Sequence, residues 1–219
     1  MLPLQINFHI LSSPILNMKT ITFLSHKGGT GKSTLAIHLA VAAQAAGQEV
    51  LLVDLDHNSA SVAEWASSRD DKQPLAVTAH FSDVTALHQQ AIDEGFDLLI
   101  LDCPPYINAE TLRVSEIADI SLLPVAPRFT EISGLPRDLG LVSQPYFVVL
   151  NSCNPDDDSG AEEVREMLNE IDIPVSPVHL ARLDAFTTAL DYGQGVTEYE
   201  ADGEATGQIQ AFLGWLNAG

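Results

Sequence analysis

The sequence predicts an α/β fold in which a mostly parallel, twisted sheet is covered by helices on both faces. Three observations lead to this prediction. Short apolar runs alternate with longer helical patterns from residue 19 onward, several of these runs are apolar without a break, and a glycine-rich loop separates the first run from the first helix. With 219 residues, 46% of them hydrophobic, the chain can fill one substantial core. We find no repeat and no domain boundary, so we expect a single domain.

The predicted strands are the apolar runs, of which 50–53 and 98–101 are the clearest because they suit a sheet that is buried on both faces. Helices are predicted where apolar residues recur at helical spacing. We expect strands over 20–24, 49–54, 75–79, 97–102, 120–125, 146–151 and 175–179. We expect helices over 32–46, 59–68, 84–94, 109–118, 132–142, 160–171, 185–192 and 205–216.

Residues 1–17 do not follow this pattern, because two prolines interrupt an apolar stretch just before Met18. We interpret them as an N-terminal extension and residues 18–219 as the folded domain. Three interpretations of the extension stay open: Met18 is the true start, the segment packs as an arm, or it binds a partner.

The charge balance is strongly acidic, with a formal net charge of −20 and a pI near 4.3. Such a surface repels polyanions at long range, and it is typical either of a protein from a high-salt cytoplasm or of an ordinary acidic protein. Cys103 and Cys153 form no paired motif, so neither a zinc site nor a disulfide framework is predicted. No segment has the length of a membrane span or the pattern of an export leader, so we expect a cytoplasmic protein.

The glycine-rich loop after the first predicted strand reads Lys27-Gly28-Gly29-Thr30-Gly31-Lys32-Ser33-Thr34. Its glycines allow backbone N–H groups to wrap a phosphate, and the next helix presents its positive N-terminal end there. Lys32 can then neutralise oxygens of the β- and γ-phosphates, while Ser33 offers a ligand to Mg²⁺. Because strand, loop and helix follow in the order of a P-loop nucleotide hydrolase, we predict that residues 28–34 bind ATP or ADP together with Mg²⁺.

Carboxylates stand at the ends of two further predicted strands. Asp54 and Asp56 close the second strand, and Asp102 closes the apolar strand over 97–102 in the Walker B form. Open α/β sheets bind ligands outside the carboxyl ends of their strands, and a single carboxylate there can hold Mg²⁺ through water. Asp102 is therefore a predicted magnesium residue. For Asp54 and Asp56, a second interpretation stays open, namely that they cap the next helix.

The loop with a lysine at its start resembles that of the ParA/MinD family of deviant Walker A ATPases, and the similarity extends along nearly the whole chain from residue 18. The resemblance implies that Lys27 reaches across a dimer to the phosphates of the other subunit. It also implies that Asp56 positions the attacking water. The predicted catalytic residues are thus Lys27, Lys32 and Asp56, and the predicted magnesium residues are Ser33, Asp54 and Asp102. His57-Asn58 stand where the family usually has Pro-Gln.

Later segments extend the resemblance. Residues 123–129 resemble the PVxPS segment of ParA-type proteins, and Asn151 stands where the family often reads the adenine edge through an amide, which can both donate and accept hydrogen bonds. A simple turn residue is the other interpretation of Asn151. Residues 181–196 resemble the C-terminal part of ParA, in which Arg182 is the best candidate for a DNA contact.

The resemblance implies an ATPase that dimerises on ATP and partitions or positions a plasmid, a chromosome or another large cargo. The implied partners are a second copy of the chain, a ParB-like or cargo-adaptor activator, and non-specific DNA, which would place the protein at the nucleoid; no membrane is implied. Three alternatives remain. A DNA-free positioning or regulatory ATPase tolerates the acidic surface better, because DNA affinity follows the number of phosphates neutralised. A P-loop amidoligase would need a substrate pocket that the sequence does not reveal, and an iron–sulfur carrier would need paired cysteines.

Overall fold

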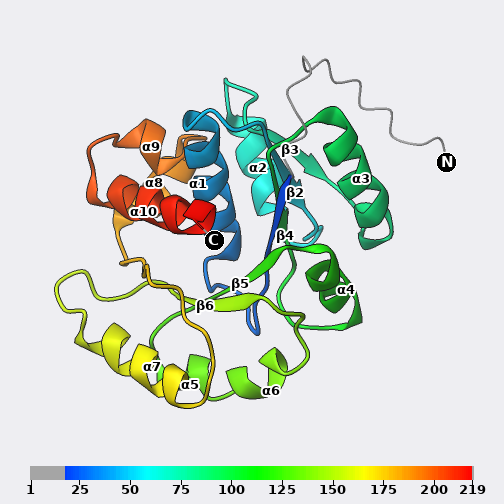
Figure 1. Cartoon of the computed structure of the whole chain (residues 1–219). Helices are drawn as coiled ribbons and strands as arrows, with labels where there is room; N and C mark the ends of the chain where they lie inside the picture. The colour runs from blue at the N-terminus through cyan, green and yellow to red at the C-terminus, as the bar shows by residue number, and fades with distance from the viewer. Residues whose placement is uncertain (1–17, 219) are drawn as a thin grey trace.

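The computed structural model describes residues 18–218 and shows one α/β domain built on a six-stranded sheet (Figure 1). The strand order is β3-β2-β4-β1-β5-β6, and every pair is parallel. The predicted fold class is thereby confirmed. The strands are β1 (Lys19–Phe23), β2 (Val50–Asp54), β3 (Leu75–Thr78), β4 (Leu98–Asp102), β5 (Ile120–Val125) and β6 (Tyr146–Leu150). The predictions for residues 1–17 lie outside the described residues.

Helices cover both faces of the sheet. They are α1 (Lys32–Ala45), α2 (Ser61–Ser68), η1 (Phe81–Asp83), α3 (Val84–Glu94), α4 (Ala109–Ile117), α5 (Phe129–Ile132), α6 (Leu135–Leu139), α7 (Ser159–Glu170), α8 (Asp184–Asp191), α9 (Val196–Tyr199) and α10 (Glu204–Ala218). Side chains alternate along each strand between two cores, as in β4, where Leu98 and Ile100 enter one core and Leu99 and Leu101 enter the other. The first core includes residues of α1, α2 and α8–α10, and the second includes residues of α3, α4 and α7.

Two predicted elements are wrong, each for a local reason. The helix expected over 132–142 is shortened to α6, which begins at Leu135, because Pro136 further inside a helix would remove a hydrogen bond and clash with the preceding turn. The strand expected over 175–179 is reduced to an isolated bridge between Val148 and Val175, because Val178 N, the next donor after Ser176 N, bonds to the Ser176 hydroxyl instead of to β6. The short helix α9 was not predicted. It begins where Glu198 accepts a hydrogen bond from Gly195 N.

The last helix packs into the core, as its apolar spacing predicts. Ile209, Phe212, Leu213 and Leu216 of α10 are buried in the core that they share with α1. Within residues 18–218, no helix combines the length and apolar character that crossing a membrane requires. Figure 1 shows the C-terminal helices, coloured orange to red, gathered beside α1.

A buried histidine fixes these C-terminal helices to α1. The Nδ1 atom of His38 accepts a hydrogen bond from Val196 N (3.2 Å), so Nε2 carries the proton and donates to the carbonyl oxygen of Phe186 (2.8 Å). Burial lowers the pKa of His38 to about 4, which keeps the ring neutral at ordinary pH. The neutral imidazole thus connects the helix that follows the glycine-rich loop with α8 and α9.

Candidate functional site

The glycine-rich loop joins β1 to α1 at the carboxyl edge of the sheet. Gly29 and Gly31 adopt positive φ angles of 77° and 93°, which side chains strongly disfavour. No side chain caps the N-terminus of α1, so the first backbone N–H groups of this helix stay available to a ligand. The hydroxyl oxygen of Thr30 is buried and has no partner among the described residues. A loop of this geometry suits a phosphate group.

Lys32 opens α1 beneath the loop and is only 7% exposed. Burial lowers the pKa of its ammonium group, while the carboxylates of Asp102 and Asp56 act in the opposite direction, as does the Cys103 thiol. A buried cation beside two carboxylates places both signs of charge within the same small site. Such a site matches a ligand that combines phosphate oxygens with a divalent cation.

Asp102 ends β4 and is 1% exposed. Burial raises its pKa to about 7, although a hydrogen bond with Ser33 and the ammonium of Lys32 lower it in part. One of its oxygens, Oδ1, has no hydrogen-bond partner among the described residues. Buried carboxylate oxygens are normally paired, so this orphan oxygen beside the Ser33 hydroxyl fits a Mg²⁺ ion.

Within residues 18–218, no three histidine, cysteine, aspartate or glutamate side chains converge to hold a metal ion by themselves.

Asp54 and Asp56 hold the segment that follows β2. The fully buried Asp54 accepts hydrogen bonds from Asp56 N (2.9 Å) and from the first backbone amides of α2, Val62 N and Ala63 N (both 3.1 Å). Burial raises its pKa, whereas these backbone bonds lower it. The helix-capping interpretation thus describes what Asp54 contacts in this structure, and its role towards magnesium stays a prediction.

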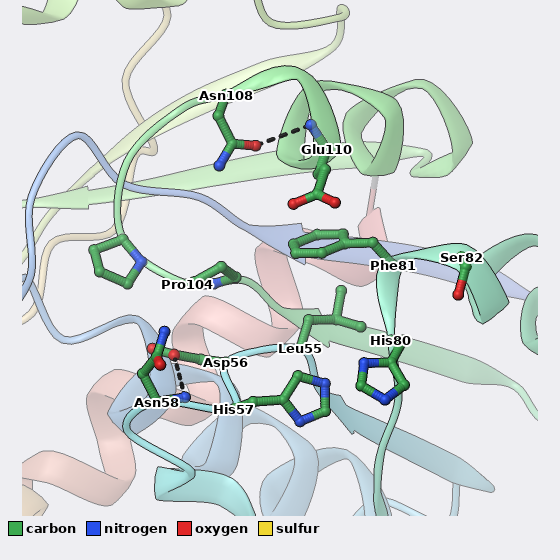
Figure 2. A pocket seen from close by; sticks show the side chains of 11 residues that line it. Leu55, Asp56, His57, Asn58, His80, Phe81, Ser82, Pro104, Asn108 and Glu110 are labelled. Carbon is green, nitrogen blue, oxygen red and sulfur yellow. Dashed lines mark hydrogen bonds between the residues drawn. The ribbon is translucent and has the colours of Figure 1, made fainter.

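Asp56 organises the tight turn over residues 57–60. Its carboxylate accepts hydrogen bonds from Asn58 N (3.1 Å), Ser59 N (3.3 Å) and the hydroxyl of Ser59 (2.8 Å). Figure 2 shows Asp56 bonded to Asn58, with the His57 ring beside His80. Three hydrogen bonds thus attach the carboxylate to the turn.

Lys27 lies at the start of the loop and is directed towards the segment that follows β5. Its ammonium group donates to the carbonyl oxygen of Thr130 (2.6 Å) and lies 3.7 Å from the carboxylate of Glu131. The side chain is 38% exposed, so water competes for these contacts. In this structure Lys27 is thus held within its own chain.

Asn151 lies directly on the glycine-rich loop. Its side-chain amide donates to the carbonyl oxygen of Thr30 (2.8 Å), and the residue is 8% exposed. A Cβ atom added at Gly31 would lie 2.3 Å from the same amide nitrogen, so any other residue there would displace the Asn151 amide and strain the backbone at its positive φ. Arg182, the candidate for a DNA contact, is exposed on the segment that leads into α8, and its backbone N–H donates to the carbonyl oxygen of Cys153 (2.8 Å).

The structure therefore brings together Lys32, Ser33, Asp102 and the Asp54–Asp56 segment, and it places Asn151 on the loop above them. One feature beside this group has no counterpart in the predictions. A cavity of about 570 Å³ extends outward from Asp56, and its walls include His57, His80 and Glu110 (Figure 2). In the sequence, the only signal of this cavity is the unusual His57-Asn58 pair.

Comparisons with known proteins agree with this geometry. The model of the CobQ/CobB/MinD/ParA nucleotide binding domain matches residues 21–196. The chromosome-partitioning ATPase Soj of Thermus thermophilus is 30% identical over 146 residues, which cover 54% of this chain and 59% of Soj. The chain thus spans less than two thirds of that relative. The maintenance of carboxysome distribution protein A of Gloeobacter kilaueensis is 28% identical over 197 residues, or 84% of this chain and 90% of the relative.

Among solved structures, the septum site-determining protein MinD of Pyrococcus horikoshii, complexed with Mg-ADP, superposes with a TM-score of 0.72. The match covers 91% of this chain and 96% of MinD at 15% sequence identity. At that identity the likeness shows the fold alone.

Proposed function

Because the chain belongs to the ParA/MinD family of nucleotide-binding ATPases, we propose that it dimerises on ATP and uses ATP hydrolysis to partition or position a large cargo. The observation that carries this proposal is the loop with two lysines, of which Lys32 is buried beside Asp102 and Lys27 lies at the outer rim. Soj and the carboxysome distribution protein are similar to this chain, and both names denote a role in distributing large assemblies. We include a plasmid, a chromosome or a protein assembly as cargo.

In this proposal, different residues of the chain bind the phosphates, hold the metal ion and orient the attacking water. The amides of residues 28–34 and Lys32 hold the phosphates, while Ser33 and Asp102 hold Mg²⁺, with Asp54 behind them. The metal ion, when bound, neutralises charge that develops on the phosphates. Asp56, at the start of its turn, orients the water that attacks. A ParB-like or cargo-adaptor protein is the expected activator.

Lys27 provides the sharpest test of the dimer. We expect Lys27→Ala to leave ADP affinity within about twofold of the wild-type value, because Lys32 and the loop amides remain. Turnover should fall about 100-fold, since charge on the transferred phosphate would lose one cationic partner from the other subunit. Isothermal titration calorimetry and a phosphate-release assay measure the two quantities, and light scattering with ATP reports dimerisation.

Lys72→Ala serves as the matched control for the Lys27 variant, because it removes a lysine from an exposed loop outside the site. It should change none of the three measurements. Normal turnover and normal dimerisation of Lys27→Ala would contradict the proposed sandwich dimer.

Replacing Asn151 distinguishes two possible roles of its side-chain amide in nucleotide binding. If its amide mainly supports the loop through Thr30, Asn151→Ala should weaken ATP and GTP binding alike, by about fivefold for one lost hydrogen bond. If the amide instead reads adenine, the variant should weaken ATP binding and leave GTP binding unchanged. Equilibrium dialysis with both nucleotides decides between these roles, and Asn154→Ala, in an exposed loop nearby, is the control.

The DNA-free alternative is favoured by one observation, the net charge of −20, which repels a polyanion. After the exposed Arg182, the chain contains no further lysine or arginine. Binding of duplex DNA with ATP or with ADP, measured over a series of salt concentrations, distinguishes the two functions. ATP-dependent binding that weakens steeply with salt supports partition on DNA, whereas no binding at any salt concentration supports a protein landmark.

A further inference from the structure

Lys27 is held by the short helix that follows β5, and this helix has a fixed place in the fold. The Lys27 ammonium donates to the carbonyl oxygen of Thr130 (2.6 Å) and lies 3.7 Å from the carboxylate of Glu131. Both acceptors belong to α5, whose last residue, Ile132, is buried in the second core. The amides of Glu131 and Ile132 both donate to the carbonyl oxygen of Arg128 (2.9 and 3.2 Å). The core and these bonds therefore keep the two acceptors in place when the lysine moves.

The backbone at Lys27 is fixed as well. The hydroxyl of Ser25 donates to the carbonyl oxygen of Lys27 (2.7 Å), and Tyr106 N donates to the carbonyl oxygen of Ser25 (3.0 Å). The side chain of Lys27 is 38% exposed, so it can rotate into solvent without disturbing the core. A change of partners at Lys27 thus needs movement of the lysine side chain alone.

The contact with α5 competes with the part that Lys27 takes in the dimer, and this step rests on the proposed function. To reach the phosphates of a second subunit, the ammonium must leave Glu131, because a phosphate beside the same ammonium would meet the carboxylate at short range and like charges repel. An ion pair between partly exposed groups changes an equilibrium only about twofold to threefold. Phosphate oxygens of higher charge can therefore displace the carboxylate.

We propose that Glu131 is a positioning residue that keeps Lys27 on its own subunit and thereby raises the protein concentration at which the ATP-bound chain dimerises. Two such contacts open when two copies associate, so their effects on the association constant multiply. Removing the charge at Glu131 therefore strengthens dimerisation about fivefold, the square of a factor slightly above two. Maximal turnover of the dimer stays nearly the same, because the lysine has already left Glu131 in that state.

Phosphate release over a series of protein concentrations, at saturating Mg-ATP, measures both quantities. We expect Glu131→Gln to lower the concentration for half-maximal specific turnover about fivefold and to leave maximal turnover within about twofold of the wild-type value. At about 1 M salt, where charges are screened over about 3 Å, the difference in half-maximal concentration should fall below about twofold. Glu163→Gln removes the same charge at an exposed position of α7 and is the control, with an expected change below about twofold.

Acylation of lysine amines tests the contact itself, without nucleotide and without a dimer. The probe is acetic anhydride at a low dose, and mass spectrometry quantifies the modified peptides. The Lys27 amine must leave Thr130 and Glu131 before it reacts, so Glu131→Gln should speed its modification about twofold to threefold. The rate at Lys72 in the same molecules is the internal reference and should not change.

Three results would overturn the proposal. They are an unchanged or higher half-maximal concentration for Glu131→Gln, an equal effect of Glu163→Gln, and the same acylation rate of Lys27 in wild-type and Glu131→Gln proteins. The second result would assign the effect to the net charge of −20, which the loss of any carboxylate reduces. Faster acylation of Lys27 in a protein that forms no dimer with ATP would support the contact with Glu131 and contradict the proposed function instead.

Discussion

Lys32→Ala is expected to lower the affinity for ADP and ATP by about 100-fold, through loss of charge-assisted hydrogen bonds to the phosphates. Lys32 is buried beneath the loop, and the part of the chain that the structure describes places Lys27 with Thr130 and Glu131 instead. No other lysine in residues 18–218 is therefore in place to compensate within the same subunit. Isothermal titration calorimetry with Mg-ADP measures the change.

The Lys32 variant needs a control for folding, because its ammonium also offsets the buried charge of Asp102. Circular dichroism melts should show a folded protein, since the pKa of Asp102 is already raised to about 7 and its carboxyl can take up a proton. A folded Lys32→Ala protein that binds Mg-ADP with wild-type affinity would contradict the assignment of the phosphate site.

The parts of the fold that the sequence predicts well are those with a strong local signal. The strand at Leu98–Asp102 is apolar up to its final aspartate and is buried throughout, and the glycine-rich loop joins β1 to α1 as expected. Where the prediction failed, a proline stood inside the apolar pattern, at Pro136 and at Pro177. The apolar spacing alone did not reveal that the helix would begin only at Leu135, or that Val178 N would bond to the Ser176 hydroxyl instead of to β6.

The candidate site likewise contains residues that local sequence patterns predict and contacts that such patterns do not predict. Motif spacing identified Lys32, Ser33 and Asp102, which the sheet brings together at one edge. By contrast, the contacts of Asn151 with Thr30 and of Lys27 with Thr130 join residues more than 100 positions apart, and no local pattern encodes them. The cavity at His57 and His80 is a further example, because three separate strand ends build its walls.

Arg69 is the most consequential residue that the sequence did not indicate. It follows α2 and is buried, and its guanidinium donates to both carboxylate oxygens of Glu198 (2.8 and 2.9 Å) and to the carbonyl oxygen of Gly193 (2.8 Å). It also stacks over the Trp65 ring at 4.7 Å, and Trp65 itself donates to Gln194. The helix α2, whose first amides bond to Asp54, is thus attached through Arg69 and Trp65 to the C-terminal segment over 193–199.

Arg69→Ala is expected to lower the free energy of unfolding by about 3 kcal/mol, because it leaves a partly buried carboxylate and buried carbonyl groups without their donor. The value lies at the lower end for broken ion pairs, since the side chain of Glu198 is 33% exposed. Urea denaturation followed by tryptophan fluorescence measures it, and Arg113→Ala, at an exposed position of α4, should cost less than about 0.5 kcal/mol.

Glu198→Gln separates the ion pair from the other contacts of Arg69. The lowered pKa of Glu198, which comes chiefly from the Arg69 hydrogen bonds working against burial, shows that the charged carboxylate is the form that the pair stabilises. A double-mutant cycle should therefore give a coupling of about 1–2 kcal/mol between Arg69→Ala and Glu198→Gln. Strictly additive effects would mean that Arg69 acts through the carbonyl groups and Trp65 alone, and that the C-terminal segment is attached without the ion pair.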